Sequence, residues 1–400
     1  MPTPHESCPT SSHRENCAAL NMSDPLAAKH QPIEFAQRFI PAARPRLPDA
    51  DAVLPYLRRI DAARSYSNFG PLLTEFESRL AGRFEAGSKV VTCVNGTQAL
   101  TLTLNALDLA KGSLVAVPSY TFVATAHAVI AAGLTPLFLD VDPNDWMLRP
   151  ETVRDALAWA PAPVSAVVVV AAFGAMPDLE AWKALREDTG LPVVLDAAAA
   201  FDQARVAEIP TVISLHATKV LGIGEGGFLA TTDAELAARV RQLTTFGFRG
   251  SRLSDIAATN AKLSEYASAV GLAALDSWET DRLQFLRAAQ MMKVAMTFLP
   301  DVQFQPGWGD GWVTSVCSVG LPNGSVDAVE YRLQDQDIHT RRWWDRGCHL
   351  NPAFAEYPRG DLSVTETLSR SVLGLPFAID MDGDDISRVA AALSLALSGR

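Results

Sequence analysis

The sequence lacks any apolar stretch long enough to cross a membrane, and it lacks an excess of positive charge. Its longest apolar stretch, at 164–176, is shorter than the roughly 20 residues that a membrane-spanning helix needs. The formal net charge is −11 at pH 7. Nucleic acids and anionic membranes both attract basic surfaces, so we expect neither as a partner of this chain.

Motifs for disulfides, metals and nucleotide phosphates are missing as well. The five cysteines include no C-x-x-C pair, the seven histidines have no metal-ligand spacing, and no G-x-x-x-x-G-K-[ST] loop occurs. An odd number of unpatterned cysteines is typical of a reducing compartment, so we predict a cytoplasmic protein without a metal site. Residues 1–30 have neither an apolar segment nor periodicity, and we expect a disordered extension there rather than a signal peptide.

From about residue 88 the sequence alternates between strand-like and helix-like segments. This alternation predicts an α/β fold with a mostly parallel, doubly wound sheet that binds ligands at the carboxyl ends of its strands. The alternation ends before residue 262. Residues 262–299 are expected to form two helices, and the residues after them to mix strands with helices. We therefore expect a large domain at 31–280 and a smaller C-terminal α+β domain at 281–400.

The stretch SLHATKVLGIGEGG, residues 214–227, places a lysine just ahead of a cluster of glycines. Gly222, Gly224 and Gly227 match the spacing G-x-G-x-x-G. A dinucleotide-binding loop needs such glycines to follow a strand and to open a helix, whereas these precede the strand-like segment GFLATTD. We therefore reject a nucleotide-binding loop and turn to the lysine, Lys219.

Four features in chain order match the requirements of pyridoxal 5′-phosphate. Free N–H groups of Gly96 and Thr97, at the start of a helix in CVNGTQAL, could hold a phosphate. Phe122 follows a strand end and could stack on a ring. Asp196 ends the apolar strand VVLD, where a carboxylate could keep a pyridine nitrogen protonated, and Lys219 could form the Schiff base.

Each of these residues also has a simpler interpretation. Lys219 alone would be a surface lysine, Asp196 a helix cap or turn residue, and Phe122 a core residue. Ser214 would be a strand-end hydroxyl bonded to the backbone, and His216 an ordered polar neighbour. However, Phe122, Asp196, Lys219 and the phosphate seat occur in the order that a cofactor site needs, each after a strand end. This combination favours a cofactor site over four unrelated residues.

Several segments of the sequence resemble those of a known family. The segments VNGTQAL, VPSYTFVATAHAVIAAG, PLFLDVD, VVLDAAAAFD and SLHATKVLGIGEGG are similar to those of the DegT/DnrJ/EryC1/StrS family. The resemblance covers roughly residues 32–400. It implies a fold-type I aminotransferase that depends on pyridoxal phosphate and acts on nucleotide-linked keto-sugars.

The resemblance also implies roles for single residues. Lys219 is then the Schiff-base lysine, Asp196 the partner of the pyridine nitrogen and Phe122 the stacking aromatic. The remaining implied contacts are to the cofactor phosphate: Gly96, Thr97, Ser214 and, from the neighbouring subunit of a homodimer with shared active sites, Asn260. Asn260 could instead cap a helix that begins near Lys262. Ala199 departs from the family, which usually has Gln or His at this position.

The expected reaction moves an amino group from L-glutamate to a nucleoside-diphosphate keto-sugar. The segments GFRG, NAKLSEY and RRWW resemble the branch of the family that acts on 4-keto-6-deoxy sugars, so we expect such a sugar as the acceptor. Amination at C3 stays open. The anionic diphosphate needs cations, for which Arg341 and Arg342 are candidates unless they form structural ion pairs. Tyr120 and His349 are further candidates for substrate contacts. Two alternatives stay open: another fold-type I enzyme, such as a lyase or aldolase, and a regulatory protein that has lost turnover.

Overall fold

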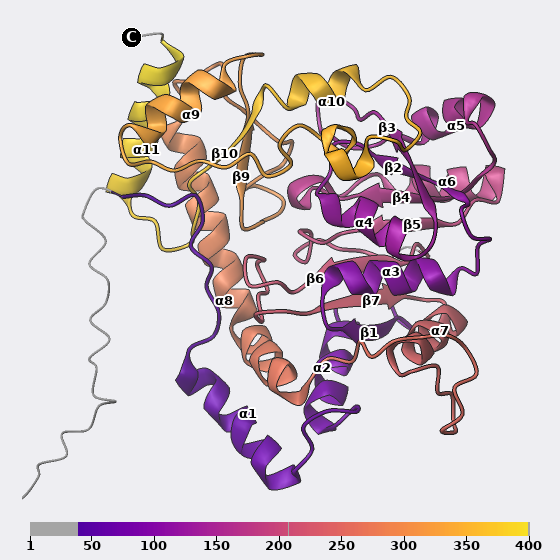
Figure 1. Ribbon diagram of the computed structural model, residues 1–400. Coiled ribbons are helices and arrows are strands. Elements are labelled where there is room, and N and C mark those ends of the chain that lie inside the picture. Colours follow the sequence, from indigo (N-terminus) through magenta and orange to yellow (C-terminus); the bar gives the residue numbers. More distant parts are fainter. Residues whose placement is uncertain (1–38, 207, 399–400) are drawn as a thin grey trace, which may run out of the picture. The chain divides into compact units, whose positions relative to one another are not determined.

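A seven-stranded sheet forms the centre of the protein (Figure 1). The computed structural model describes residues 39–206 and 208–398, so the extension expected at 1–30 lies outside the described residues. The strands of this sheet are, in spatial order, β1 (Lys89–Cys93), β7 (Gly227–Thr231), β6 (Thr211–Ser214), β5 (Val193–Asp196), β4 (Val164–Val170), β2 (Leu114–Pro118) and β3 (Thr135–Leu139).

All strand pairs in this sheet are parallel except the two that involve β7, which runs antiparallel to both β1 and β6. The central strands are buried on both faces, which explains why their sequences are apolar throughout instead of alternating. The expectation of a mostly parallel α/β sheet is confirmed.

Helices cover both faces of the sheet and bury one apolar core on each. One core holds side chains of α3 (Gly96–Ala106), α4 (Val123–Ala131) and α7 (Ala234–Thr244). The other holds side chains of α2 (Pro71–Ala81), α5 (Pro150–Trp159), α6 (Leu179–Thr189) and α8 (Glu265–Ala295). Helices on both faces are the mark of a doubly wound fold.

The expectation of two helices in residues 262–299 is wrong, because α8 is one continuous helix of 31 residues. The polar run at 279–282 does not break the helix: Glu279 and Thr280 are exposed, while Arg282 forms an ion pair of 2.5 Å with Asp202. Ser264 caps the start of α8 by accepting a hydrogen bond from Ala267 N. The expected domain boundary at residue 280 falls inside this helix.

α8 passes from the side of α1 (Ala50–Ala63) and α2 to the side of α11 (Gly383–Leu397) (Figure 1). A second, three-stranded antiparallel sheet lies in the C-terminal part of the chain. Its strands are β8 (Gln303–Phe304), β9 (Cys317–Gly320) and β10 (Val372–Leu375). The helices in the same part of the chain are α9 (Val326–Gln334), α10 (Ser363–Leu368), η2 (Cys348–Leu350) and η3 (Pro352–Phe354). One further short helix, η1 (Ala172–Gly174), comes directly after β4. Within the described residues, no helix has the length and apolar character needed to cross a membrane.

Candidate functional site

The carboxyl ends of the parallel strands meet at one edge of the sheet, and chemically distinctive residues gather there. β5 ends at Asp196, β6 ends at Ser214, and the chain reaches Lys219 soon after β6. β5 and β6 are paired side by side, with Asp196 opposite Val212. The fold therefore brings together residues that the sequence separates by more than twenty positions.

Asp196 is a buried carboxylate, only 7% exposed. Its Oδ2 accepts a hydrogen bond of 2.8 Å from Thr125 Oγ1, and its Oδ1 accepts one of 3.1 Å from Ala198 N. Burial raises the pKa of Asp196, while these two donors and the charge of Lys219 lower it again. The carboxylate keeps further lone pairs with which it can accept a proton-bearing group of a ligand.

Lys219 follows β6 in a turn where its N–H donates to His216 O at 2.8 Å. Loss of hydration lowers the pKa of its ammonium group, and the negative charge of Asp196 opposes this shift. A lysine with a lowered pKa carries a larger fraction of neutral amine at neutral pH. That is the form that attacks a carbonyl carbon or accepts a proton from carbon.

The glycine cluster after Lys219 has a packing role. A Cβ atom on Gly227 would lie 2.4 Å from Gly96 N, and a Cβ on Gly96 would lie 3.0 Å from Ser214 Cβ. Any side chain at Gly227 would collide with the backbone at the start of α3, and one at Gly96 would crowd Ser214 at the end of β6. Gly227 therefore allows α3 to lie against the strand ends, and the glycine cluster does not form a nucleotide-binding loop.

The N-terminus of α3 forms a seat for an anion beside Ser214. Asn95 caps the helix by accepting a hydrogen bond of 2.8 Å from Gln98 N. The N–H groups of Gly96 and Thr97 have no acceptor among the described residues. Free N–H groups at a helix start, together with the helix dipole, favour the binding of a phosphate.

Phe122 lies at the start of α4 and is 56% exposed, while Tyr120 and Thr121 just before it are buried. The core interpretation of Phe122 is therefore wrong. An exposed aromatic ring at the strand ends leaves a face on which a planar ligand can stack.

A C-terminal segment, residues 339–354, packs onto the turn after β2. Cys348 N donates to Ser119 O at 2.7 Å, and Ser119 Oγ lies 2.7 Å from His349 Nδ1. Trp344 stacks on Phe173 with ring centroids 3.8 Å apart and meets Tyr120 edge to face at 5.0 Å. This segment therefore reaches the strand ends from the far end of the sequence.

Tyr120 and His349 are both buried in this contact. Burial raises the pKa of Tyr120, so its hydroxyl stays protonated. Burial also lowers the pKa of His349, against the opposing charge of Glu366. The Nε2 atom of His349 is buried without a hydrogen-bond partner in the described structure, and the nearest charged group is Glu366, whose Oε1 lies 3.7 Å away.

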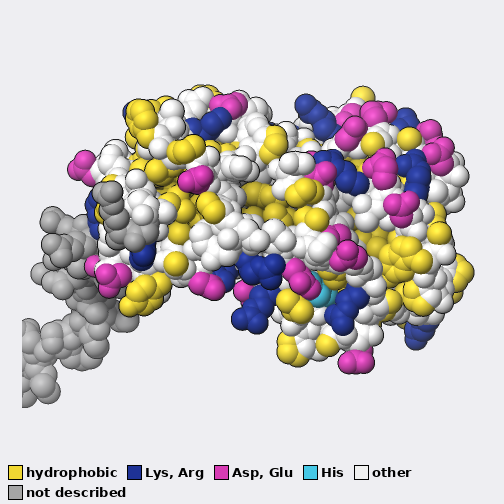
Figure 2. All heavy atoms as spheres, turned by 90° about the horizontal axis from the view of Figure 1, so that it is seen from above, with side chains coloured by type: hydrophobic (Ala, Val, Ile, Leu, Met, Phe, Trp, Pro, Cys, Tyr) yellow, Lys and Arg dark blue, Asp and Glu magenta, His cyan; other side chains and the backbone are white. Residues whose placement is uncertain are grey.

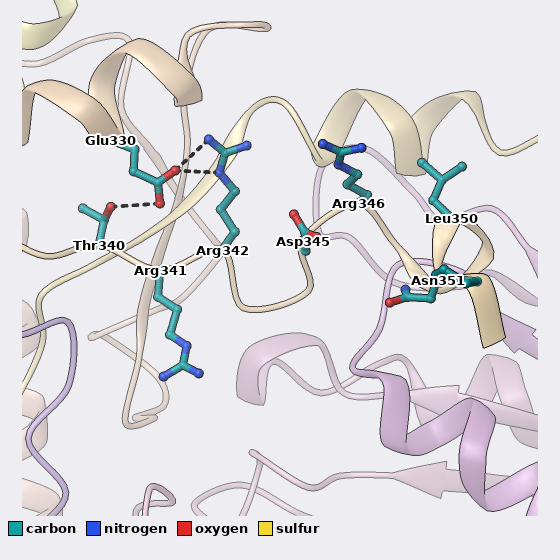
Figure 3. Close-up of a pocket in the computed structure, with 9 residues that line it drawn as sticks. Glu330, Thr340, Arg341, Arg342, Asp345, Arg346, Leu350 and Asn351 are labelled. Carbon is teal, nitrogen blue, oxygen red and sulfur yellow. Dashed lines mark hydrogen bonds and ion pairs between the residues drawn. The ribbon is translucent and has the colours of Figure 1, made fainter. Parts of the chain in front are cut away.

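A surface pocket of about 580 Å³ is lined mainly by residues 340–352 (Figure 3). Arg342 lies on its wall and binds Glu330 at 2.7 Å and Asp327 at 2.5 Å, so its charge is already paired. Arg341 points away from Arg342 (Figure 3), and its guanidinium lies 5.1 Å from the ring centre of Trp343. The structural ion pair foreseen for one of these arginines is present at Arg342.

The face in Figure 2 carries basic and acidic side chains next to one another. No broad patch of one sign is visible on this face. Recognition of an anionic ligand therefore depends on a few placed cations and N–H groups. Among the described residues, no group of three or more His, Cys, Asp or Glu side chains is arranged to hold a metal ion.

Asn260 is exposed and does not cap α8, since Ser264 does so. Its Oδ1 accepts a hydrogen bond from Lys262 Nζ. The neighbouring Ala261 O accepts from Val94 N at 3.0 Å, which places this segment beside the strand that leads into α3.

The residues fit pyridoxal phosphate: an anion seat, an exposed ring, a buried carboxylate and a lysine share one edge of the sheet. Three residues of the site were not predicted from the sequence: Thr125, which donates to Asp196, and Phe173 and Trp344, which stack on each other. The threonine had a local signal, since it stands three residues after Phe122 in the helix start. The two aromatic residues had none, because their contact joins segments 171 positions apart.

This fold and site define a fold-type I, pyridoxal-phosphate-dependent aminotransferase. The family model described as "DegT/DnrJ/EryC1/StrS aminotransferase family" matches residues 49–394. The chain belongs to this family.

Individual relatives agree with this assignment. A dTDP-4-amino-4,6-dideoxy-D-glucose transaminase of Shigella dysenteriae is 32% identical over 365 residues, which cover 88% of this chain and 97% of that protein. The crystal structure of DesI in the presence of its TDP-sugar product has a TM-score of 0.81 and 33% identity, covering 91% of this chain and 94% of DesI. The crystal structure of a putative PLP-dependent aminotransferase from Bacillus cereus has a TM-score of 0.84 and 28% identity, covering 89% of this chain and 100% of that chain.

The electrostatic coupling between Asp196 and Lys219 gives a testable prediction. In the cofactor-free protein, Asp196→Asn removes the charge that favours the ammonium form, so the pKa of Lys219 should fall further below its usual range. Labelling of Lys219 by an amine-specific reagent, followed by peptide mass spectrometry across pH, should show its midpoint move to lower pH. Asp140→Asn is the control, because Asp140 does not act on Lys219. An unchanged or higher midpoint in Asp196→Asn would contradict the coupling.

Proposed function

We propose that this aminotransferase moves an amino group from L-glutamate to the keto group of a nucleoside-diphosphate-linked 4-keto-6-deoxyhexose. The observation that carries the proposal is the Asp196–Lys219 pair beside the anion seat of α3. The nature of the acceptor is supported by two relatives: one is named as a transaminase of a dTDP-linked dideoxy sugar, and the other was crystallised with a TDP-sugar product.

The residues at the strand ends would hold the cofactor as follows. Gly96, Thr97 and Ser214 bind its phosphate with N–H and hydroxyl donors. Phe122 stacks on its ring, and Asp196 keeps the ring nitrogen protonated. When bound, pyridoxal phosphate supplies an electron sink that stabilises negative charge on the carbon next to the transferred nitrogen.

Lys219 would hold the cofactor through Nζ at rest. When free, its neutral amine would accept the proton from the donor carbon and give it back later in the same half of the reaction. The lowered pKa of Lys219 suits this role, since a base works best when its pKa lies near the working pH. In the second half of the reaction the same amine moves the proton in the opposite direction, as the keto-sugar becomes an amino sugar.

Arg341 is the cation that we assign to the diphosphate of the substrate. It lines the pocket, and the described structure gives it no carboxylate partner, in contrast to Arg342. We assign further substrate contacts to His349, whose buried Nε2 has no hydrogen-bond partner and lies 3.7 Å from Glu366 Oε1, and to Tyr120, which packs edge to face on Trp344.

The proposed reaction is tested by incubating the enzyme with L-glutamate and a panel of dTDP- and UDP-linked 4-keto and 3-keto sugars. We expect mass spectrometry to show an amino sugar nucleotide only in the presence of glutamate, and fastest with the 4-keto-6-deoxy sugar. Lys219→Ala should lose essentially all turnover. Formation of 2-oxoglutarate without an aminated sugar from any of these acceptors would contradict the substrate class.

We also propose that the working unit is a homodimer with shared active sites. The segments that flank Asn260 along the chain, and the loop before α2, carry exposed aromatic and aliphatic side chains: Tyr66, Phe69, Phe246, Phe248, Leu253 and Tyr266. Within this set, Tyr66 stacks on Tyr266, and the ring centroids of Phe246 and Phe248 lie 6.0 Å apart. An apolar surface of this kind favours contact with a second copy. In this dimer, the exposed amide of Asn260 donates to the phosphate in the partner's site.

Subunit mixing tests the shared site. Lys219→Ala and Asn260→Ala chains should each be impaired alone, and mixing them by unfolding and refolding should restore activity. In the mixed dimer, one site draws an intact Lys219 and an intact Asn260 from different chains. Asn260 could instead serve the α3 start of its own chain, beside which its backbone lies. Heterodimers that form without any recovery would establish that alternative.

A further inference from the structure

Two buried threonines form a chain of hydrogen bonds that ends on Asp196. Thr121 Oγ1 lies 3.1 Å from Thr125 Oγ1, and Thr125 Oγ1 donates to Asp196 Oδ2 at 2.8 Å. Both threonines are 1% exposed, so water does not compete for these hydroxyls. Thr121 has no role so far, and the only contact described for Thr125 is its hydrogen bond to Asp196.

The direction of the chain follows from the number of hydrogens. A threonine hydroxyl has one hydrogen, and an ionised carboxylate can only accept. Thr125 must therefore give its hydrogen to Asp196, and Thr121 must give its own to Thr125. Hydrogen bonds that point the same way polarise one another, so Thr121 strengthens the bond between Thr125 and the carboxylate.

We propose that Thr125, supported by Thr121, is a positioning residue that holds Asp196 ionised and aimed at the cofactor's ring nitrogen. This inference rests on the proposed placement of that nitrogen at Asp196. Burial alone favours the protonated carboxyl group, and such a group could not keep a positive charge on the ring. The hydroxyl of Thr125 makes the carboxylate less basic, so the proton stays on the ring nitrogen.

The same chain ties together two contacts of the cofactor. Thr121 and Thr125 lie on either side of Phe122 at the start of α4, and Thr125 N donates to Phe122 O at 3.1 Å. The turn that presents the stacking ring is therefore the turn that holds the carboxylate. A change at Thr125 alters the electronic contact with the ring, while the backbone that carries Phe122 keeps its own hydrogen bonds.

The test compares Thr125→Val, which removes the hydroxyl at nearly constant shape, with Thr125→Ser, which keeps it. Holoenzymes are loaded with pyridoxal phosphate that carries ¹⁵N in the ring, and the ¹⁵N chemical shift reports whether this nitrogen is protonated. We expect Thr125→Val to shift the proton equilibrium about tenfold toward the carboxyl group, the effect of losing one hydrogen bond to a charged group. The rate constant of the glutamate half-reaction should fall by about the same factor with little change in KM. Thr125→Ser should resemble the wild type.

Thr103→Val is the matched control. Thr103 is also fully buried in a helix, but its hydroxyl donates to the backbone oxygen of Ala99 at 2.8 Å. The proposal is overturned if Thr125→Val gives the ¹⁵N shift and half-reaction rate of Thr103→Val. If Thr125→Val does not fold, Thr121→Val decides: a smaller change in the same direction supports the chain, and wild-type values refute it.

Asp196→Asn separates this inference from the placement on which it rests. If that variant leaves the ¹⁵N signal unchanged, the ring nitrogen does not lie at Asp196 and the placement is wrong. If Asp196→Asn changes the signal and Thr125→Val does not, only the role of Thr125 is refuted. Neither result depends on the identity of the sugar nucleotide.

Discussion

A carboxylate that is taken out of water must be met by donors or cations, and the architecture of this protein meets that need at Asp196. Thr125 and Ala198 donate to its two oxygens, and the charge of Lys219 acts on it from the turn after β6. The opposing pKa shifts of Asp196 and Lys219 have the same origin, the loss of hydration. Loss of hydration therefore makes the charged form of each group less stable than it would be in water.

The rest of the fold serves this arrangement. Parallel strands bring their carboxyl ends to one edge, and Gly227 and Gly96 let the start of α3 come within contact of Ser214. The segment at 339–354 closes over the turn after β2 through Cys348 and Trp344. Phe173, on which Trp344 stacks, has a positive φ of 52°, a conformation that costs free energy for a bulky residue. The stacked contact holds that strained turn in place beside the site.

The sequence allowed the sheet and the main residues of the site to be predicted, because those signals are local. An apolar strand that ends in Asp196, or a lysine ahead of glycines, is visible in one short window. Partners could not be predicted where the contact is distant: Thr125 meets Asp196 across 71 positions, and Trp344 stacks on Phe173 from the C-terminal part of the chain. The continuity of α8 was missed because its polar turn at 279–282 resembles a helix boundary, while packing along both ends keeps the helix intact.

The central claim is that Lys219 is the amine that binds pyridoxal phosphate at the strand ends. Reduction of the holoenzyme with borohydride, followed by peptide mass spectrometry, tests it most directly. The account predicts that the cofactor becomes fixed to the peptide that contains HATKVLG and to Lys219 within it. Fixation on any other lysine, or a Lys219→Ala protein that is still labelled to the same extent, would contradict it.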